Sequence, residues 1–360
     1  MKLPRATLVN LVLAVLCFIW LLPTLGVFVS SFRTRDDVQS TGWWTVVPHR
    51  EWVSVERFKP GPDVDPNGEM TFAGVTGTFD ELREGIIGPD GRRVMWLGNK
   101  RRGEIVVQQR EWTANANFTL RNYRDVLTGK QYEVTDADGN AYTLRGDDLS
   151  GAFLNSLAVT VPSVLLPLTL AAFSAYGFAW MRFPGRKFAF AAMVALLVVP
   201  LQIALVPVLS DYVHLQLNGT YLGIWLAHTG FGLPLAIYLL YNYIAGLPRE
   251  IFEAATVDGA SHLTIFTRIV VPLAMPVLAS YAIFQFLWVW NDYLVALIFI
   301  GSQPDVQVLT MRLAEIIGSR GNDWHLLTAG AFVSLLLPLV IFFSLQRYFV
   351  RGLVAGSVKA

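Results

Sequence analysis

The residues best suited to chemistry form a charged stretch between two apolar runs. Residues 247–276 read LPREIFEAATVDGASHLTIFTRIVVPLAMP and place the acids Glu250, Glu253 and Asp258 ahead of Gly259. Fixed carboxylates beside small side chains are suited to pairing with basic groups of another protein, which is the chemistry of docking rather than of catalysis. Whether these residues serve docking or another role depends on the helices that carry them and on the face where they lie.

Helix signals predict a first short helix. Pro248 is a favourable first helical residue, and acids in the first turn interact well with the helix dipole. Phe252, Ala255 and Thr256 follow at the spacing of one helical face. Gly259 is then expected to end the helix.

A second helix is predicted directly after the first. Ser261 can cap it, the helix runs through residues 266–271, and Pro272 is expected to stop it. The whole stretch is therefore predicted to be a helix-turn-helix at a membrane surface.

One face of this predicted motif is built for close approach. Ala254, Ala255 and Gly259 are small, Phe252 is expected to act as a plug, and Glu253 supplies a fixed charge. The alternative is an amphipathic helix that rests on lipid headgroups, but such helices favour Lys and Arg on the polar face. Because this face carries acids instead, docking into a groove of another protein is favoured.

The composition indicates a membrane protein. The chain has 360 residues, of which 54% are hydrophobic and 15% charged, and its mean hydropathy is +0.46. The net charge of +1 offers no basic field for nucleic acid. The single cysteine, Cys17, lies in the first apolar run, so the chain cannot form an internal disulfide.

Apolar runs long enough to span a bilayer predict six transmembrane helices. They cover Leu8–Ser31, Asn155–Met181, Phe188–Leu209, Tyr221–Tyr243, Leu273–Ile300 and Leu326–Tyr348. The first is too long for the apolar core of a signal peptide and lacks a clear cleavage site, so we expect a retained anchor.

The positions of Lys and Arg in the short links predict the orientation. The links expected inside carry Lys2 and Arg5, then Arg182, Arg186 and Lys187, then Arg249 and Arg268, and finally Arg347, Arg351 and Lys359. The opposite links, 210–220 and 301–325, carry only Arg312 and Arg320. Both termini and residues 247–272 are therefore expected in the cytoplasm, and the long segment after the first span outside.

That outer segment reads as a folded, β-rich module. Runs such as EIVVQQREW and QYEVTDADGNAYTLR alternate apolar and polar residues, and GPDG and DADGN are turn signals. We therefore expect β-hairpins between the first two spans.

Several motifs together resemble a known family. EAA at 253–255 with Gly259 four residues on, and IVVP at 269–272, are similar to the EAA motif of permease subunits of binding-protein-dependent ABC importers. The surrounding sequence resembles the MalG type of carbohydrate permease. The segments that carry this resemblance are NFTLRNYRDVL (117–127), NSLAVTVPS (155–163), AAFSAYGFAWMRFPGRK (171–187), IFQFLWVWNDYLVAL (283–297) and LQRYFVRGLVAGSVKA (345–360).

The resemblance implies an all-α membrane protein with six transmembrane helices, the type I ABC importer permease fold with a MetI-like core. It covers residues 1–32 and about 113–360, and the segment 33–112 departs from the family by its length. The implied organisation is a first transmembrane helix (1–32), a periplasmic insertion (33–150), a permease core (151–348) with an EAA loop at 247–272, and a cytoplasmic tail (349–360).

The resemblance also implies the partners and the coupling residues. A MalF-type second permease, a dimer of cytoplasmic ABC ATPase subunits and an extracytoplasmic sugar-binding protein are expected, in a bacterial inner membrane. The cargo would be a carbohydrate, such as an α-glucoside disaccharide of the maltose or trehalose kind. ATP and Mg would be bound by the ATPase, and no cofactor by this chain. The EAA-loop residues implied to contact the ATPase are Glu250, Phe252, Glu253, Ala254, Ala255, Asp258, Gly259 and Ala260.

Polar residues inside the predicted spans are candidates for the translocation path. Those near the end of the fifth run are Trp288, Asn291, Asp292 and Tyr293, and the others are Gln202, His228, Asn242 and Gln285. Such side chains line a path or hold kinked helices together, and the second role is the commoner one. Trp288 and Tyr293 have rings that can stack on a sugar, although aromatic anchors are also common near membrane interfaces.

Other functional classes find little support in the sequence. TGKQ at 128–131 lacks the remaining residues of a P-loop, and the five histidines show no metal-ligand spacing. An ion-coupled transporter would show repeated halves, and a membrane-anchored enzyme would need a catalytic constellation within 33–150. Neither pattern is visible in the sequence, so no catalytic or metal-binding residue is expected.

Overall fold

The computed structural model describes residues 5–61, 64–100, 102–129, 131–135, 141–145, 148–301, 303–320 and 323–355. Contacts divide the chain into two compact units, Arg33–Phe118 and the remainder, which are described separately. The predicted tail at 349–360 is a helix to Ala355, and residues 356–360 lie outside the described residues.

The first unit is a bundle of long apolar helices. Its described residues contain five helices long and apolar enough to cross a membrane, or up to six if one bent pair counts as a span. These five lie in α1 (Arg5–Phe32), α5 (Leu149–Trp180), α8 (Tyr221–Ile244), the continuous helix that ends with α11 (Val271–Trp290), and α14 (Trp324–Ala355).

The predicted third span is not a single straight helix, and this corrects the expectation from the sequence. It consists of α6 (Arg186–Ala195), the short η2 (Leu196–Val198) and α7 (Leu201–His214), with a bend of 106°. Val199 is extended because the residue before a proline is disfavoured in helical conformation, and Pro200 follows it. The chain therefore turns sharply within this apolar run.

The boundaries of the predicted fifth span are also corrected. The helix runs without a stop through α10 (His262–Ile265), the π-helical η3 (Phe266–Val270) and α11 to Trp290. Pro272 does not end it, because the proline lies in the first turn of α11, directly after a π-helical turn with altered hydrogen bonding. The continuous helix then breaks at residues 291–293, before α12 (Leu294–Phe299).

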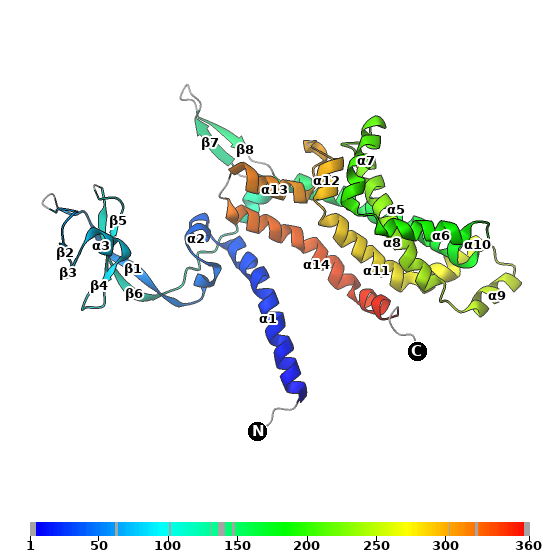
Figure 1. Ribbon diagram of the computed structural model, residues 1–360, viewed down its shortest axis with the longest axis horizontal. Helices are drawn as coiled ribbons and strands as arrows, with labels where there is room; N and C mark the ends of the chain where they lie inside the picture. Colours follow the sequence, from blue (N-terminus) through cyan, green and yellow to red (C-terminus); the bar gives the residue numbers. More distant parts are fainter. Residues whose placement is uncertain are drawn as a thin grey trace. The chain divides into compact units, whose positions relative to one another are not determined.

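Helix α5 packs along α8 and α11, and α11 packs along α14 (Figure 1). Alanines such as Ala171, Ala175 and Ala236 are fully buried where α5 and α8 meet, and small residues allow such close helix approach. Helix α1 contacts α14 but leaves nearly all of its apolar surface exposed in the single chain.

Shorter elements complete the first unit. They are α4 (Arg121–Thr128), β7 (Gln131–Thr135), β8 (Ala141–Arg145), α9 (Arg249–Val257), η4 (Pro304–Val306) and α13 (Leu309–Arg320). Strands β7 and β8 pair antiparallel on either side of residues 136–140, which lie outside the described residues. Residues 119–148, which the sequence analysis assigned to the insertion, group with the helical unit by contact.

The second unit, Arg33–Phe118, is built on strands. Its main sheet is antiparallel with the order β1-β6-β5-β4. The elements are α2 (Arg35–Ser40), η1 (Trp43–Val46), β1 (His49–Phe58), β2 (Met70–Phe72), β3 (Val75–Gly77), α3 (Phe79–Glu84), β4 (Ile86–Ile87), β5 (Arg93–Leu97) and β6 (Glu104–Thr113). Leu82, Trp96 and Ile105 are almost fully buried in its core. The strand predicted at EIVVQQREW is confirmed as β6.

Candidate functional site

The EAA loop forms a short helix, a turn and the start of a long helix. Pro248 caps α9 rather than being its first helical residue. Asp258 closes α9, and Gly259 has a φ of +76°. The Ser261 hydroxyl then accepts a hydrogen bond from the backbone N–H of Thr264 at 3.2 Å and so caps α10, as the sequence predicts.

The backbone rather than crowding requires glycine at position 259. A Cβ at Gly259 would meet nothing within 4 Å, but the left-handed φ disfavours residues with side chains. The N–H of Gly259 donates to the Thr256 carbonyl at 3.0 Å, and that of Ala260 donates to the Ala255 carbonyl at 2.9 Å. These bonds close the C-terminus of α9.

Most of the predicted coupling residues are accessible in the single chain. Glu253 accepts a hydrogen bond from Arg249 at 2.8 Å, and both side chains of this pair are more than half exposed. An exposed pair of this kind contributes little energy, so Glu253 remains open to a different basic partner. The exposed members of the predicted set are Glu250, Glu253, Ala254, Asp258 and Gly259, and the half-buried ones are Ala255 and Ala260.

The structure corrects the role expected for Phe252. Its side chain is only 6% exposed and stacks on Trp180 with a centroid distance of 3.8 Å and an interplanar angle of 17°. It therefore fills this chain's own core and does not project as a plug for a partner's groove. The Trp180 indole N–H also donates to the Ile244 carbonyl at 3.1 Å, which ties together the ends of α5, α8 and α9.

A second contact fixes the start of α10 to the same helix. The Tyr176 hydroxyl and His262 Nδ1 lie 2.9 Å apart, and Tyr176 belongs to α5. Phe173 of α5 stacks on Phe266 at 4.3 Å. These anchors were not predicted from the sequence, although the aromatic residues in FSAYGFAW at the end of the second span are a signal that could have indicated them.

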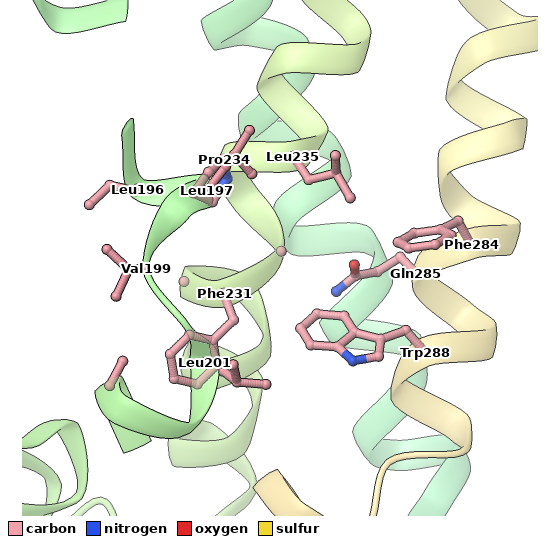
Figure 2. Close-up of a pocket in the computed structure, with 13 residues that line it drawn as sticks. Leu196, Leu197, Val199, Leu201, Phe231, Pro234, Leu235, Phe284, Gln285 and Trp288 are labelled. Carbon is pink, nitrogen blue, oxygen red and sulfur yellow. The ribbon is translucent and has the colours of Figure 1, made fainter. Parts of the chain in front are cut away.

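A cavity of about 380 Å³ lies beside the bend between α6 and α7 (Figure 2). In Figure 2, Phe284, Gln285 and Trp288 project from α11 toward the bent segment of Leu196 to Leu201. The wall is otherwise apolar and is completed by Leu196, Leu197, Val199, Leu201, Ala204, Gly230, Phe231, Gly232, Pro234 and Leu235. An apolar cavity with aromatic rings and one amide in its wall is a typical small-molecule site.

The polar wall of this cavity is held by a buried network. Gln285 is 0% exposed, and its amide nitrogen donates to the Ser163 carbonyl at 3.2 Å and to the His228 carbonyl at 3.5 Å. The Tyr281 hydroxyl lies 2.9 Å from the Gln285 amide oxygen and 3.1 Å from the Gly232 carbonyl. The network thus joins α5, α8 and α11 at one level of the bundle.

Two glycines of α8 shape the cavity in different ways. A Cβ at Gly232 would lie 2.7 Å from the Gln285 amide, so glycine is needed there for close packing. A Cβ at Gly230 would meet nothing within 4 Å, so a side chain can start from this position on the cavity wall.

The predicted path residues do not act as one group. Trp288 lines the cavity, whereas the Asn291 amide donates to the Leu287 carbonyl at 2.8 Å and the Asp292 carboxylate accepts from the N–H groups of Val295 and Ala296. Both polar side chains thus satisfy backbone groups where α11 breaks. Tyr293 is 42% exposed and does not line the cavity.

Of the other polar candidates, only Gln285 lines this cavity. The buried His228 ring lies with its Nε2 3.9 Å from the Asp292 carboxylate and edge-on to Trp288. Asn242 donates to the Tyr238 carbonyl within its own helix. Among the described residues, no three His, Cys, Asp or Glu side chains gather as metal ligands would.

Comparison with known proteins decides the family. Residues 154–354, which include the EAA loop and the cavity, match the family described as binding-protein-dependent transport system inner membrane component. The chain belongs to this family. It is therefore a transport component of an inner membrane and not an enzyme, and the family membership predicted from the motifs is confirmed.

Two relatives are similar to this chain over nearly its whole length. One is the osmoprotective compounds uptake permease protein GgtD of Synechocystis, 45% identical over 98% of this chain and 92% of its own length. The other is the α-glucoside transport system permease protein AglG of Rhizobium meliloti, 43% identical over 99% of this chain and 98% of its own length.

A solved structure shows the same fold. It belongs to a bacterial ABC transporter involved in the import of the acidic polysaccharide alginate. The TM-score is 0.57 at 17% identity, and the match covers 97% of this chain and 99% of that one. This match supports the predominantly helical permease fold of the present chain.

Proposed function

We propose that this chain forms half of the membrane path of a sugar importer and that its cargo is an α-glucoside. The observation that carries the proposal is the 43% identity to the α-glucoside permease AglG, because the match covers 99% of this chain and includes the segment between α1 and α4. A shorter match to the melibiose/raffinose/stachyose import permease protein MelC of Bacillus subtilis, at 34% identity over 59% of this chain, also names sugars as cargo.

A second candidate cargo is an osmoprotective compound. It is favoured by the 45% identity to GgtD, which is of the same order as the identity to AglG. Both candidates fit a cavity that contains no charged side chain among its lining residues. Uptake measurements must therefore include both classes of compound.

The cavity beside the α6–α7 bend is proposed as part of the translocation path. The Trp288 ring offers an apolar face to the C–H surface of a sugar, while the buried Gln285 amide, which is hydrogen-bonded within the bundle, holds this wall of the cavity in place. The bend gives this region a broken helix, and broken helices are typical of segments that line paths inside a bundle.

The EAA loop is proposed to couple the path to ATP hydrolysis. The exposed acids and small residues of α9 would dock into a groove of a cytoplasmic ATPase, where Glu253 would pair with a basic residue. Movement of α9 would then reach α5 through the stack of Phe252 on Trp180, and movement of α10 through the contact of His262 with Tyr176. These two contacts are direct links from the loop to a transmembrane helix.

The proposed assembly has four further parts. They are a MalF-type second permease, two copies of a cytoplasmic ABC ATPase that binds ATP and Mg, and an extracytoplasmic binding protein that delivers the sugar. Both termini and α9 would face the cytoplasm, and Arg33–Phe118 would lie outside. The distribution of Lys and Arg in the short links supports this orientation.

Reconstitution of the complete transporter in proteoliposomes tests the proposal. The loaded binding protein is added outside and ATP inside, and uptake is measured for maltose, trehalose, other α-glucosides and osmoprotective compounds. ATP-dependent uptake of an α-glucoside supports the first candidate, and uptake of an osmoprotective compound alone supports the second. Uptake that follows an ion gradient without ATP would contradict both.

The position of Gly230 allows a matched test of the path. We expect Gly230→Ala to transport almost normally, because its Cβ meets no neighbour, and Gly230→Trp to block transport by filling the cavity. Normal uptake by Gly230→Trp at equal membrane levels would show that the sugar passes elsewhere.

A further inference from the structure

A two-stranded ribbon extends from the sheet of the second unit. Pairing of β5 with β6 stops at Arg93 and Gln108, whereas pairing of β1 with β6 continues as far as His49 and Thr113. Residues 49–53 and 109–113 therefore have no third strand beside them (Figure 1). Residues 109–112, Arg50 and Val53 are exposed, whereas His49, Glu51 and Trp52 are half-buried.

One face of the ribbon alternates arginine and tryptophan. Arg50 lies opposite Trp112, and Trp52 lies opposite Arg110. Because alternate residues of a strand point to the same side, these four side chains share one surface, here called the Arg–Trp face. Each guanidinium lies over the opposite indole, at 5.4 Å for Arg50 and 5.9 Å for Arg110.

The Arg–Trp face has the chemistry of an interaction surface. Among the described residues, neither Arg50 nor Arg110 forms an ion pair with a carboxylate, and Trp112 is 69% exposed. Arginine and tryptophan are the residue types most enriched at the energetic centres of protein interfaces. A guanidinium presents five N–H donors in a fixed plane that matches carboxylates.

The opposite face of the ribbon carries the opposite charge. Glu51 lies directly across from Glu111, and the Glu51 carboxylate is 3.3 Å from His49 Nε2. The ribbon thus separates a basic aromatic surface from an acidic one. This separation gives the Arg–Trp face a defined preference for an acidic partner, and it supplies a matched control on the same two strands.

We propose that the Arg–Trp face docks an acidic patch on the extracytoplasmic binding protein. The inference rests on the proposed function, in which such a protein delivers the sugar and this unit lies outside the membrane. A small, exposed and charged surface suits a partner that must bind and leave in every transport cycle, because transient interfaces are smaller and more polar than permanent ones.

The geometry favours a protein over a sugar at this face. Each indole already has a guanidinium over one side of its ring, so stacking of a sugar on that side is blocked. The groups that remain available are N–H donors and exposed ring edges, which suit carboxylates on a protein surface.

Charge reversal on the complete transporter tests the proposal. The transporter is placed in nanodiscs of zwitterionic lipid and, in parallel, of anionic lipid, and binding of the sugar-loaded binding protein is measured at low and high ionic strength. We expect Arg50→Glu/Arg110→Glu to weaken binding about tenfold or more at low salt, with a smaller effect at high salt. The milder Arg50→Gln/Arg110→Gln should weaken binding less, and Glu51→Gln/Glu111→Gln should leave it within about twofold of wild type. Resistance of each variant to protease shows that the unit is folded.

The outcomes separate this inference from the proposed function. If the wild-type transporter takes up sugar and both arginine variants bind the sugar-loaded protein as tightly as wild type does, the docking face is overturned and the proposed function stands. A loss of binding that appears only in nanodiscs with anionic lipid assigns the face to headgroups and also overturns it. Equal losses in the glutamate control overturn the role of charge. A wild-type transporter that neither binds a sugar-loaded protein nor takes up sugar overturns both the docking face and the proposed function.

Discussion

Gly259 shows how one residue can be required by its backbone alone. Its φ of +76° costs roughly 1–2 kcal/mol for a residue with a side chain, although no neighbour obstructs a Cβ. Asn tolerates this conformation better than Leu. We therefore expect Gly259→Leu to abolish ATP-driven uptake and Gly259→Asn to retain a large part of it, at comparable membrane levels. Equal uptake by the two variants would show that the turn conformation is not needed.

Glu253 tests the charge on the docking surface. Removal of one member of a partly desolvated ion pair costs on the order of 2–5 kcal/mol, because the partner's charge is left unpaired. Glu253→Lys is therefore expected to abolish uptake while the protein still inserts into the membrane. A charge reversal at the ATPase residue it contacts should restore part of the activity.

Arg249→Ala is the matched control for this variant. It removes only the exposed pair with Glu253, which is worth about 0.3–0.5 kcal/mol, and it should leave uptake nearly normal. Near-normal uptake by Glu253→Lys as well would indicate that α9 is a surface helix without a coupling role.

Local signals explain which residues of the loop were predicted correctly. The cap by Ser261 and the turn at Gly259 depend on neighbours within a few positions, and both appear in the structure. The burial of Phe252 depends on Trp180 of a different helix, which periodicity within one helix cannot reveal. Sequence reasoning therefore found the loop but assigned the wrong environment to its aromatic residue.

At the scale of elements, the contact between α9 and α5 leads to a prediction: loss of the Phe252 ring should uncouple ATP hydrolysis from sugar transport. Phe252→Leu keeps an apolar side chain in the core but removes the aromatic stack on Trp180, which contributes about 0.5–1.5 kcal/mol beyond burial. We expect the assembled transporter to hydrolyse ATP with little uptake of sugar. The measurement is the ratio of sugar transported to ATP hydrolysed in proteoliposomes.

Val257→Ala provides the control for this prediction. Val257 lies on the same short helix but is 87% exposed, so its truncation leaves the contact with α5 intact. A normal ratio in the Phe252→Leu variant, or an equal fall in both variants, would argue against transmission through the stack.

The length of an apolar run predicts that a helix is present, but it does not predict where that helix bends or breaks. Length and hydropathy located the helices that are long enough to span a membrane. They did not locate the 106° bend at Val199, because that run remains apolar through the change of direction, or the break at Asn291, because two polar residues, Asn291 and Asp292, do not lower the hydropathy of the long apolar run around them enough to end it. They also placed a helix end at Pro272, where a π-helical turn lets the helix continue. The cavity depends on one of these unpredicted features, the α6–α7 bend.

At the scale of the molecule, the orientation is a prediction from charge alone. The chain has one native cysteine, so Cys17→Ala gives a background for labelling. We expect a cysteine introduced at Lys100 to react with an impermeant reagent from outside intact cells. A cysteine introduced at Val257 should react only after the membrane is opened. The reverse pattern would overturn the proposed orientation and with it the docking of α9 onto a cytoplasmic ATPase.

The residues on either side of the second unit in the sequence lie together within the first unit. The backbone N–H of Thr119 donates to the Phe32 carbonyl at 2.6 Å, so the chain leaves and re-enters the helical unit at adjacent residues. Asn122 donates to the Ser31 carbonyl at 2.9 Å, and the Tyr123 hydroxyl lies 2.6 Å from that of Ser31. These contacts between α1 and α4 do not involve the residues of the second unit.

Excision of the second unit is therefore expected to leave the permease assembled. Replacing Arg33–Phe118 by a short glycine linker keeps Phe32 and Thr119 within bonding distance and closes the helical unit without strain. If the second unit receives the binding protein, the shortened transporter should reach normal uptake only at higher concentrations of that protein. The measurement is the concentration of loaded binding protein that gives half-maximal uptake, with Gly230→Trp as a variant that should instead lower the maximal rate. An unchanged half-maximal concentration would mean that the second unit does not receive the binding protein, whereas failure to assemble would mean that it holds the permease together.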